Sequence, residues 1–311
     1  MKRYLLLFLK GMAMGAADVV PGVSGGTVAF ITGIYDELLK SLAQLPKAGL
    51  LLLRGRVQEA WREANATFLL VLFGGILLSV LSLAKLITWL LVSQPIAIWS
   101  FFFGLILVST YLVGREVQRW NLTRVASFVA GGALAWWITV AAPVQLEGTP
   151  LTVFLAGAVA ICAMILPGIS GSFILVLLGL YSLVLGAVKN LQLDILLLFA
   201  SGCVLGLLSF ARVLSWLLQH WRDMTLAFLT GLMVGSLNKV WPWKQTLSWR
   251  TDSSGVSQPV LQENLWPTQF ALQFDTDPQL LAALLLAAGG ITLVLGLEWL
   301  AKRLSLSGER D

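Results

Sequence analysis

Two similar motifs contain the residues of this sequence that could bind an anion. Residues 21–27 read PGVSGGT, and residues 167–172 read PGISGS. Proline and clustered glycine end a helix, and a helix that begins again after such a break presents unpaired N–H groups, a positive dipole end and here a serine hydroxyl. These groups favour a phosphate or a carboxylate as ligand. The alternative is that the glycines only allow close helix packing, as small residues do throughout membrane proteins.

Two basic residues inside apolar stretches, Lys85 and Arg212, complete the predicted anion site. A shift of 127 residues places one on the other. A cation away from the membrane surface costs about 2.5–3.5 kcal/mol on insertion scales, so the charge of a bound anion is expected to compensate it. Alternatively, both long side chains reach the membrane surface. The predicted phosphate-binding residues are Lys85, Arg212, Ser24, Gly25, Gly26, Thr27, Ser170, Gly171 and Ser172, and the predicted helix breaks are Pro21, Gly22, Pro167 and Gly168.

The composition indicates that membrane-spanning helices position these residues. Of the 311 residues, 58% are apolar and 12% are charged, whereas roughly 25% is the usual charged share. This balance excludes an ordinary soluble enzyme. One histidine and two cysteines also exclude a zinc cluster or a disulfide framework, and we expect no metal, no cofactor and no nucleic-acid partner.

An internal repeat organises the chain. A shift of 146 residues places the first motif on the second and residues 33–35 on residues 179–181. A weaker match places residues 130–132 on residues 288–290. The first copy of the motif enters from the cytoplasm and the second from outside, because three spans separate them. Inverted repeats with broken helices are the architecture of secondary transporters, in which two half-sites alternately face the two sides.

The predicted fold is an all-α polytopic membrane protein of two inverted-topology repeats, each with a re-entrant, broken helical hairpin and three transmembrane helices. The first repeat covers residues 1–142, with the hairpin at 4–42 and spans at 66–92, 96–113 and 125–142. The second covers residues 143–311, with the hairpin at 151–188, spans at 195–218, 224–237 and 279–300, and an extracytoplasmic loop at 244–278.

Positive charge predicts the orientation. If each hairpin returns to the side from which it came, most of the 21 Lys and Arg residues lie on one face. Cytoplasmic loops carry the excess of Lys and Arg, so both termini are predicted to be cytoplasmic. The opposite face holds only Lys189, Lys239, Lys244 and Arg250.

Asp18 is a carboxylate three residues before the first break, and its counterpart before the second break is the apolar Met164. A carboxylate in such a place is stabilised by protonation, by a bound ion or by a cationic partner. Two roles are therefore open for Asp18: coupling to a proton or sodium gradient, and capping of a helix.

The motifs together resemble those of a known family: PGVSGGT at 21–27, PGISGS at 167–172, GIYD at 33–36, GLMVGSL at 231–237 and WPW at 241–243. Over nearly its whole length the chain is similar to a bacterial family, long described as a domain of unknown function, that includes the PopT-type polyprenyl-phosphate transporters. The resemblance implies a flippase of the inner (cytoplasmic) membrane that returns undecaprenyl phosphate, the lipid carrier of cell-envelope and peptidoglycan sugars, to the inner leaflet. It implies a transporter and no enzyme, with the lipid as its partner.

Two other functions remain open at this point. One is a carrier of a small soluble anion, phosphate or carboxylate. The other is a membrane phosphatase acting on polyprenyl diphosphate, with Ser24 or Ser170 as nucleophile, although neither serine has a histidine close by in the sequence to act as a base. The sequence makes no prediction of the oligomeric state.

Overall fold

The computed structural model describes residues 2–20, 23–251 and 257–308, so Pro21 and Gly22 of the first motif lie outside the described residues. The described chain forms, in order, α1 (Lys2–Asp18), α2 (Gly25–Ile31), α3 (Tyr35–Leu53), α4 (Val57–Glu63), α5 (Ala66–Ser93), α6 (Pro95–Gly114), α7 (Leu122–Val140), α8 (Pro150–Ile165), α9 (Gly171–Leu177), α10 (Tyr181–Lys189), α11 (Leu193–His220), α12 (Arg222–Ser236), β1 (Lys244–Thr251), β2 (Ser257–Asn264), α13 (Pro267–Phe274) and α14 (Leu280–Gly308).

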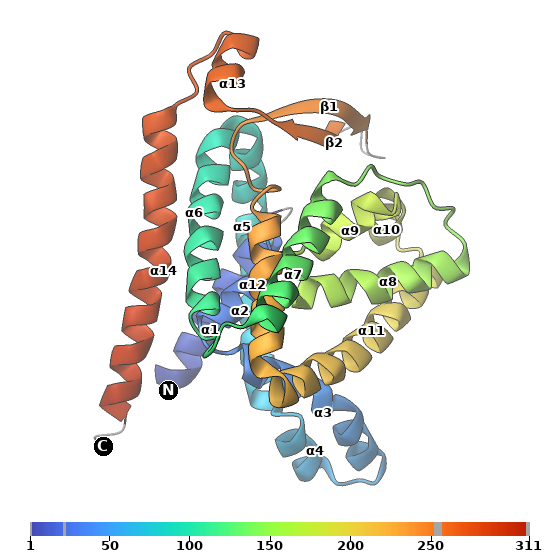
Figure 1. The fold of residues 1–311 in the computed structure, drawn as a ribbon. Helices are drawn as coiled ribbons and strands as arrows, with labels where there is room; N and C mark the ends of the chain where they lie inside the picture. The colour runs from blue at the N-terminus through green and yellow to red at the C-terminus, as the bar shows by residue number, and fades with distance from the viewer. Residues whose placement is uncertain (1, 21–22, 252–256, 309–311) are drawn as a thin grey trace.

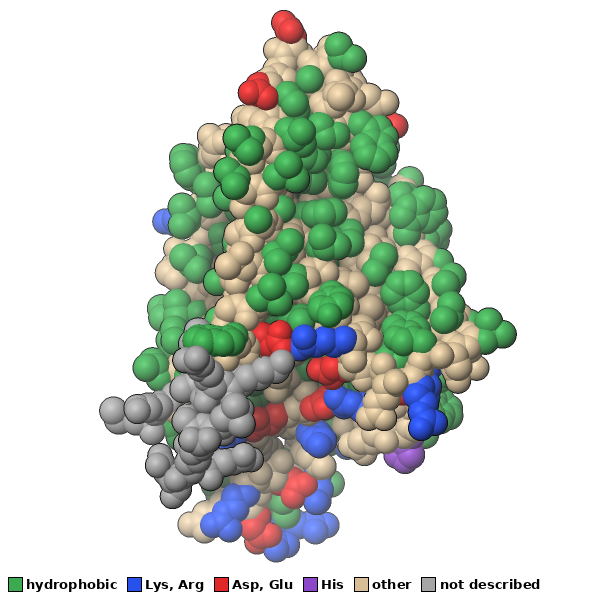
Figure 2. All heavy atoms as spheres, turned by 60° about the vertical axis from the view of Figure 1, so that its left-hand side comes forward, with side chains coloured by type: hydrophobic (Ala, Val, Ile, Leu, Met, Phe, Trp, Pro, Cys, Tyr) green, Lys and Arg blue, Asp and Glu red, His purple; other side chains and the backbone are tan. Residues whose placement is uncertain are grey.

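The protein is a multi-pass helical membrane protein. Of the described helices, five are long and apolar enough to cross a bilayer: α5, α6, α7, α11 and α14. Helix α12, with 15 residues, is shorter than the roughly 20 residues that a simple span needs. Figure 2 shows apolar side chains over the middle of the visible face, while charged side chains gather at the lower end. Both chain termini lie at that end in Figure 1.

Each broken region contains three helices, where the sequence analysis predicts two. Helix α1 is followed by α2 and α3, and α8 is followed by α9 and α10. The second interruption falls at Gly33 and at Gly179, whose φ angles are +71° and +73°. Glycine adopts this left-handed conformation without steric cost, so it ends the short helix at each place. Between α9 and α10 the chain bends by 114°.

The loop at 244–278 has secondary structure of its own, so the described chain is not entirely helical. Strands β1 and β2 form an antiparallel two-stranded ribbon in which Lys244 pairs with Asn264, and α13 follows it. The two tryptophans of the WPW motif, which follows α12, form hydrogen bonds to this segment. Trp241 Nε1 donates to the Leu265 carbonyl and Trp243 Nε1 to the Pro278 carbonyl, both at 2.8 Å.

Equivalent helices form equivalent pairs in the two halves of the chain. Helix α1 packs along α5, and α8 packs along α11. A Cβ atom at Gly75 would clash with the carbonyl oxygen of Phe8, and a Cβ atom at Gly202 would clash with that of Phe154. The two contacts correspond, because the shift of 127 residues places Gly75 on Gly202 and the shift of 146 residues places Phe8 on Phe154. Small residues allow such close approach of helix backbones in a membrane.

The last two helices of each half pack against the other half. Helix α6 packs on α14, and α7 packs on α12. A Cβ atom at Gly290 would clash with the Phe101 carbonyl, and one at Gly131 would clash with the Phe228 carbonyl. Gly131 therefore corresponds to Gly290, and the predicted match of residues 130–132 with 288–290 is wrong by one residue. The reason is geometric, because only the glycine that faces the partner helix occupies the equivalent place.

Candidate functional site

The first motif caps its own helix, α2. Asp18 Oδ1 accepts a hydrogen bond of 2.7 Å from the Gly25 N–H, and Ser24 Oγ accepts one of 3.0 Å from the Gly26 N–H. The Thr27 N–H donates to the Ser24 carbonyl at 3.0 Å. These are the first N–H groups of α2, the donors that the sequence analysis assigns to an anion. In this structure they are satisfied by Asp18 of α1 and by Ser24 of the motif, and Asp18 has the capping role that is one of its two predicted roles.

The tips of the two broken regions meet inside the protein. Ser24 Oγ lies 3.0 Å from the carbonyl oxygens of both Met164 and Leu166 and shares its single hydrogen between them. The Gly168 N–H donates to Thr27 Oγ1 at 3.1 Å. Ser24 and Thr27 are 1% and 0% exposed, so water does not compete for these bonds. We call this contact, between residues 24–35 and residues 164–168, the tip junction.

Tyr35, the first residue of α3, adds another hydrogen bond to the tip junction. Its hydroxyl donates to the Ile165 carbonyl at 3.2 Å, and the side chain is 2% exposed. A Cβ atom at Gly26 would clash with the same Ile165 carbonyl. Glycine at position 26 is therefore required by the close approach of the two backbones. The sequence analysis did not assign a role to Tyr35, although its place in the repeated Gly-x-Tyr pattern was a signal that could have found it.

The second tip differs from the first because its helix, α9, has no side-chain cap. Ser170 Oγ and Ser172 Oγ lie 2.8 Å apart and share one hydrogen bond. Gly171 packs against the Ala160 carbonyl of α8, where an added Cβ atom would lie at 2.5 Å. Gly168, with φ of +87°, lies against Ser236 of α12. The two serine hydroxyls of this tip are thus the motif hydroxyls that are not used to join the two halves.

Lys85 and Arg212 lie away from the tip junction. Both side chains are exposed, Lys85 on α5 and Arg212 on α11. The Arg212 Nε lies 3.4 Å from the Ala43 carbonyl of α3, and no described residue forms an ion pair with Lys85. The structure therefore does not bring these cations together with the two motifs. Their phosphate-binding role stays a prediction, and their exposure agrees with the alternative of reaching the membrane surface.

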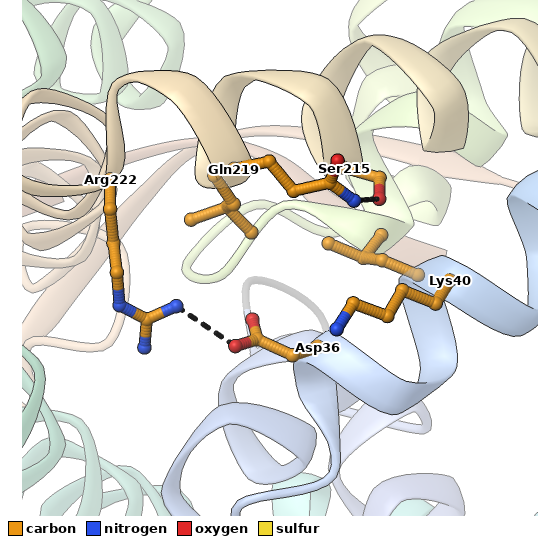
Figure 3. Close-up of a pocket in the computed structure, with 7 residues that line it drawn as sticks. Asp36, Lys40, Ser215, Gln219 and Arg222 are labelled. Atoms are coloured by element: carbon orange, nitrogen blue, oxygen red, sulfur yellow. Dashed lines mark hydrogen bonds and ion pairs between the residues drawn. The ribbon is translucent and has the colours of Figure 1, made fainter.

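A charged cluster joins the two halves at the end that holds the termini. Arg222, at the start of α12, donates to Asp36 of α3 at 2.9 Å and to Glu116, after α6, at 3.2 Å. Figure 3 shows Arg222 directed at Asp36, with Lys40 and Gln219 lining the same small cavity of about 80 Å³. The carboxylates and the guanidinium are about half exposed, so each pair contributes modestly to stability. The sequence analysis gave no indication of this cluster.

Within the part of the chain that the structure describes, no group of three or more His, Cys, Asp or Glu side chains is placed to hold a metal ion. The tip junction itself consists of hydrogen bonds between the ends of α2 and α3 and the end of α8 with the residues that follow it.

Comparison with known proteins identifies the family. The chain matches the model of the undecaprenyl phosphate translocase-like family over residues 14–258. It is 56% identical over 301 residues to a Vibrio cholerae protein named polyprenyl-phosphate transporter, and the alignment covers 96% of this chain and 98% of that protein. A polyprenyl-phosphate transporter of Staphylococcus aureus is 35% identical over 252 residues, which cover 75% of this chain and 85% of that one. No solved structure gave a match. The chain therefore belongs to the undecaprenyl phosphate translocase-like family.

Proposed function

We propose that this protein carries a polyprenyl phosphate, in the form of undecaprenyl phosphate, from the outer to the inner leaflet of the bacterial cytoplasmic membrane. It works by alternating access and without a catalytic step. Its membership of the translocase-like family and the names of its relatives support the substrate. The observation that carries the mechanism is the tip junction, where the two broken regions meet through Ser24, Thr27 and Tyr35.

The strength of the tip junction suits a gate. A buried hydrogen bond contributes about 0.5–1.5 kcal/mol net to stability, so its three donor groups contribute a few kcal/mol together. A ligand that binds better to one of two states can shift an equilibrium of this size. We infer that the tip junction closes one side of the pathway and that lipid binding favours its opening.

The recurring helix pairs support two inverted repeats as the frame of this movement. Pairs α1–α5 and α8–α11 correspond, as do pairs α6–α14 and α7–α12. Pairs α6–α14 and α7–α12 interlock the halves, so the broken regions are the parts that move against a common frame. The charged end of the molecule, with both termini, faces the cytoplasm in this proposal.

Asp18, Lys85 and Arg212 keep their predicted roles as parts of the proposal. Asp18 is the candidate for coupling to a proton or sodium gradient. Lys85 and Arg212 contact the phosphate in a state in which the lipid lies at the exposed faces of α5 and α11, since neither reaches the tip junction in this one. Full transport by a Lys85→Ala, Arg212→Ala double variant would show that neither cation is needed to bind the phosphate.

The experiment is transport of polyprenyl phosphate in proteoliposomes of the purified protein. A phosphatase added outside removes phosphate only from lipid in the outer leaflet, so the fraction hydrolysed reports movement between leaflets. We expect the protein to make the inner-leaflet pool accessible over time and protein-free vesicles to retain it. Competition by soluble phosphate would favour a soluble-anion carrier, and phosphate release from polyprenyl diphosphate without added phosphatase would favour an enzyme.

Locking the tip junction tests the mechanism separately. Cysteines introduced at Ser24 and Leu166, in a background without Cys162 and Cys203, can be joined by a short bifunctional thiol reagent that a reductant cleaves. We expect the cross-linked protein to stop transport and reduction to restore it. The single-cysteine variants treated in the same way are the control. Transport at the full rate by the cross-linked protein would show that the tip junction is no gate.

A further inference from the structure

A polar cavity of about 270 Å³ lies at the end of the molecule opposite to the termini. The end of α7, the turn after α12 and the two strands β1 and β2 line it. Its volume is several times the roughly 30 Å³ that a water molecule occupies, so a larger polar group fits. Two lysines, Lys239 and Lys244, are among the residues that line this cavity, and they flank the WPW motif in the sequence.

Neither lysine has an acidic partner among the residues that the structure describes. The Lys239 ammonium lies 4.4 Å from the ring centroid of Phe173, and the Lys244 ammonium lies 3.7 Å from that of Trp99. Lys244 Nζ also donates to the Lys239 carbonyl at 2.5 Å. Among the described residues, no carboxylate forms an ion pair with either ammonium. Two cations therefore share a partly enclosed space, stabilised only by aromatic faces and one carbonyl.

The enclosure opposes the positive charge of both groups. Burial lowers the pKa of Lys239 to about 8. Burial and the neighbouring Lys239 lower the pKa of Lys244 well below its usual value. Both groups lie outside the helices that span the membrane, in the turn after α12 and in β1. A bound anion would offset the desolvation and the mutual repulsion together.

The two asparagine side chains of the cavity already have partners. Asn238 Nδ2 donates to Thr139 Oγ1, and Asn264 Nδ2 donates to the carbonyl and the Oδ1 of Asn238, all at 2.8 Å. Glu263 is the ionisable side chain of β2 on the cavity wall, and it is exposed. The Lys239 ammonium forms no hydrogen bond to a described residue, so its N–H donors are available to a ligand. A ligand with several acceptor oxygens matches these donors.

The cavity adjoins the second tip. Phe173, which lies under the Lys239 ammonium, directly follows Ser172 of the PGISGS motif. Ser236, which is three residues before Lys239 in the chain, lies against Gly168 of the same tip. The lysines are therefore next to the tip whose hydroxyls are not used to join the two halves. An anion held by the lysines would be positioned beside the moving part of the protein.

We propose that Lys239 and Lys244 form a capture site for a phosphate monoester at the outer entrance of the transport pathway. As a step of lipid transport, this site rests on the proposed function. The ligand group that this site recognises is a phosphate with one ester bond or none. A lipid headgroup and free phosphate both supply such a group. The site receives the phosphate before the tip junction opens and passes it toward Ser170 and Ser172.

The test is equilibrium binding by calorimetry with the full-length protein in lipid nanodiscs. The probes are geranyl phosphate, the alcohol geraniol and inorganic phosphate. We expect geranyl phosphate to bind and geraniol not to bind. Hydrogen bonds to a charged group predict that Lys239→Gln and Lys244→Gln each weaken binding by about tenfold to 100-fold. Lys239→Arg, which keeps the charge, should retain most of the affinity and shows that the site is folded.

Lys189→Gln is the matched control, because Lys189 is an exposed lysine at the end of α10 and lies outside the cavity. Its affinity for geranyl phosphate should equal that of the wild type. Lysine-dependent binding of inorganic phosphate would show that the headgroup alone is recognised, and binding of geranyl phosphate only would identify the lipid as the source. Wild-type affinity of the Lys239→Gln, Lys244→Gln double variant, or no binding by the wild type, would overturn the proposal.

Transport distinguishes this proposal from the proposed function. If the wild type binds geranyl phosphate through the lysines but moves no polyprenyl phosphate in proteoliposomes, the transport function fails and the binding site stands. If the wild type transports the lipid and the double variant transports it equally well at limiting lipid concentration, the capture step fails and the transport function stands.

Discussion

Replacing Thr27 by valine is the sharpest test of the tip junction. Thr27 is fully buried, and its hydroxyl oxygen accepts the hydrogen bond of 3.1 Å from the Gly168 N–H. Valine has nearly the same shape, so Thr27→Val removes the acceptor without opening a cavity. A buried N–H group left without a partner costs about 1–3 kcal/mol. Since about 1.4 kcal/mol corresponds to a factor of ten, the tip junction should open between about fivefold and 150-fold more often.

Hydrogen exchange of the Gly168 amide measures this opening directly. When closing is fast, the exchange rate follows the population of the open state. Mass spectrometry of the peptide that contains Gly168 should therefore show exchange accelerated by the same factor in Thr27→Val. Thr27→Ser is the control, because it keeps the acceptor oxygen and should exchange nearly as slowly as the wild type.

The same pair of variants separates two roles of Thr27. If it holds the tips together, faster exchange accompanies any change in transport. If instead Thr27→Val abolishes transport while the exchange of Gly168 is unchanged, Thr27 contacts the phosphate directly. That result would refute the structural role derived from the hydrogen bond to Gly168.

Four further predictions concern packing, charge and ionisation. Gly290→Ala, whose Cβ would meet the Phe101 carbonyl, should lower the free energy of unfolding by about 1–3 kcal/mol. The control Gly289→Ala, whose Cβ has no described atom within 4 Å, should raise it by up to about 1 kcal/mol. Equal thermal midpoints of the two variants in detergent would contradict the packing of α6 on α14. Arg222→Gln should cost about 0.2–1 kcal/mol for each of its two half-exposed ion pairs, and this difference in thermal midpoint should shrink in high salt. Asp18→Asn keeps an acceptor for the Gly25 N–H and should unfold near the wild-type temperature, whereas Asp18→Ala should lose about 1 kcal/mol; full dependence of transport by Asp18→Asn on the proton or sodium gradient would exclude coupling through this residue. Binding of geranyl phosphate should weaken as the pH rises through about 8, because the Lys239 ammonium loses its proton there. Lys244 and Glu263 also line this cavity, so the control is Lys239→Arg, whose charge persists. The pH profile of that variant should be flatter in the same titration.

Local signals in the sequence were sufficient for the long apolar helices and for the interruptions at the two motifs. Proline and glycine end helices wherever they stand, so the interruptions at both motifs could be read from the residues alone. The apolar stretches are long enough to identify α5, α6, α7, α11 and α14 as spans. The second interruption in each broken region was missed, although Gly33 and Gly179 are aligned by the repeat. Only the positive φ at each glycine shows that the helix ends there.

The positions of the cations could not be predicted in the same way. Helices α5 and α11 are apolar on almost every face, so their patterns do not indicate which side is buried. Lys85 and Arg212 were therefore assigned to the interior, but they lie on the exposed sides. Lys239 and Lys244, in contrast, line a cavity, although the sequence analysis gives Lys244 only a place at the start of the loop 244–278 and Lys239 only a place on the same face of the membrane.

The sequence by itself determined that the chain is a helical membrane protein with a repeated pattern of broken helices, because chain length, apolarity and helix-ending residues act locally. Only the tertiary structure decided what the motif residues contact. Ser24 and Thr27 bind backbone groups about 140 residues away, and the sequence pattern would equally allow a bound anion. The physical reason is that a hydroxyl bonds to whichever acceptor or donor the packing brings within about 3 Å, and in this fold α2 packs against α8.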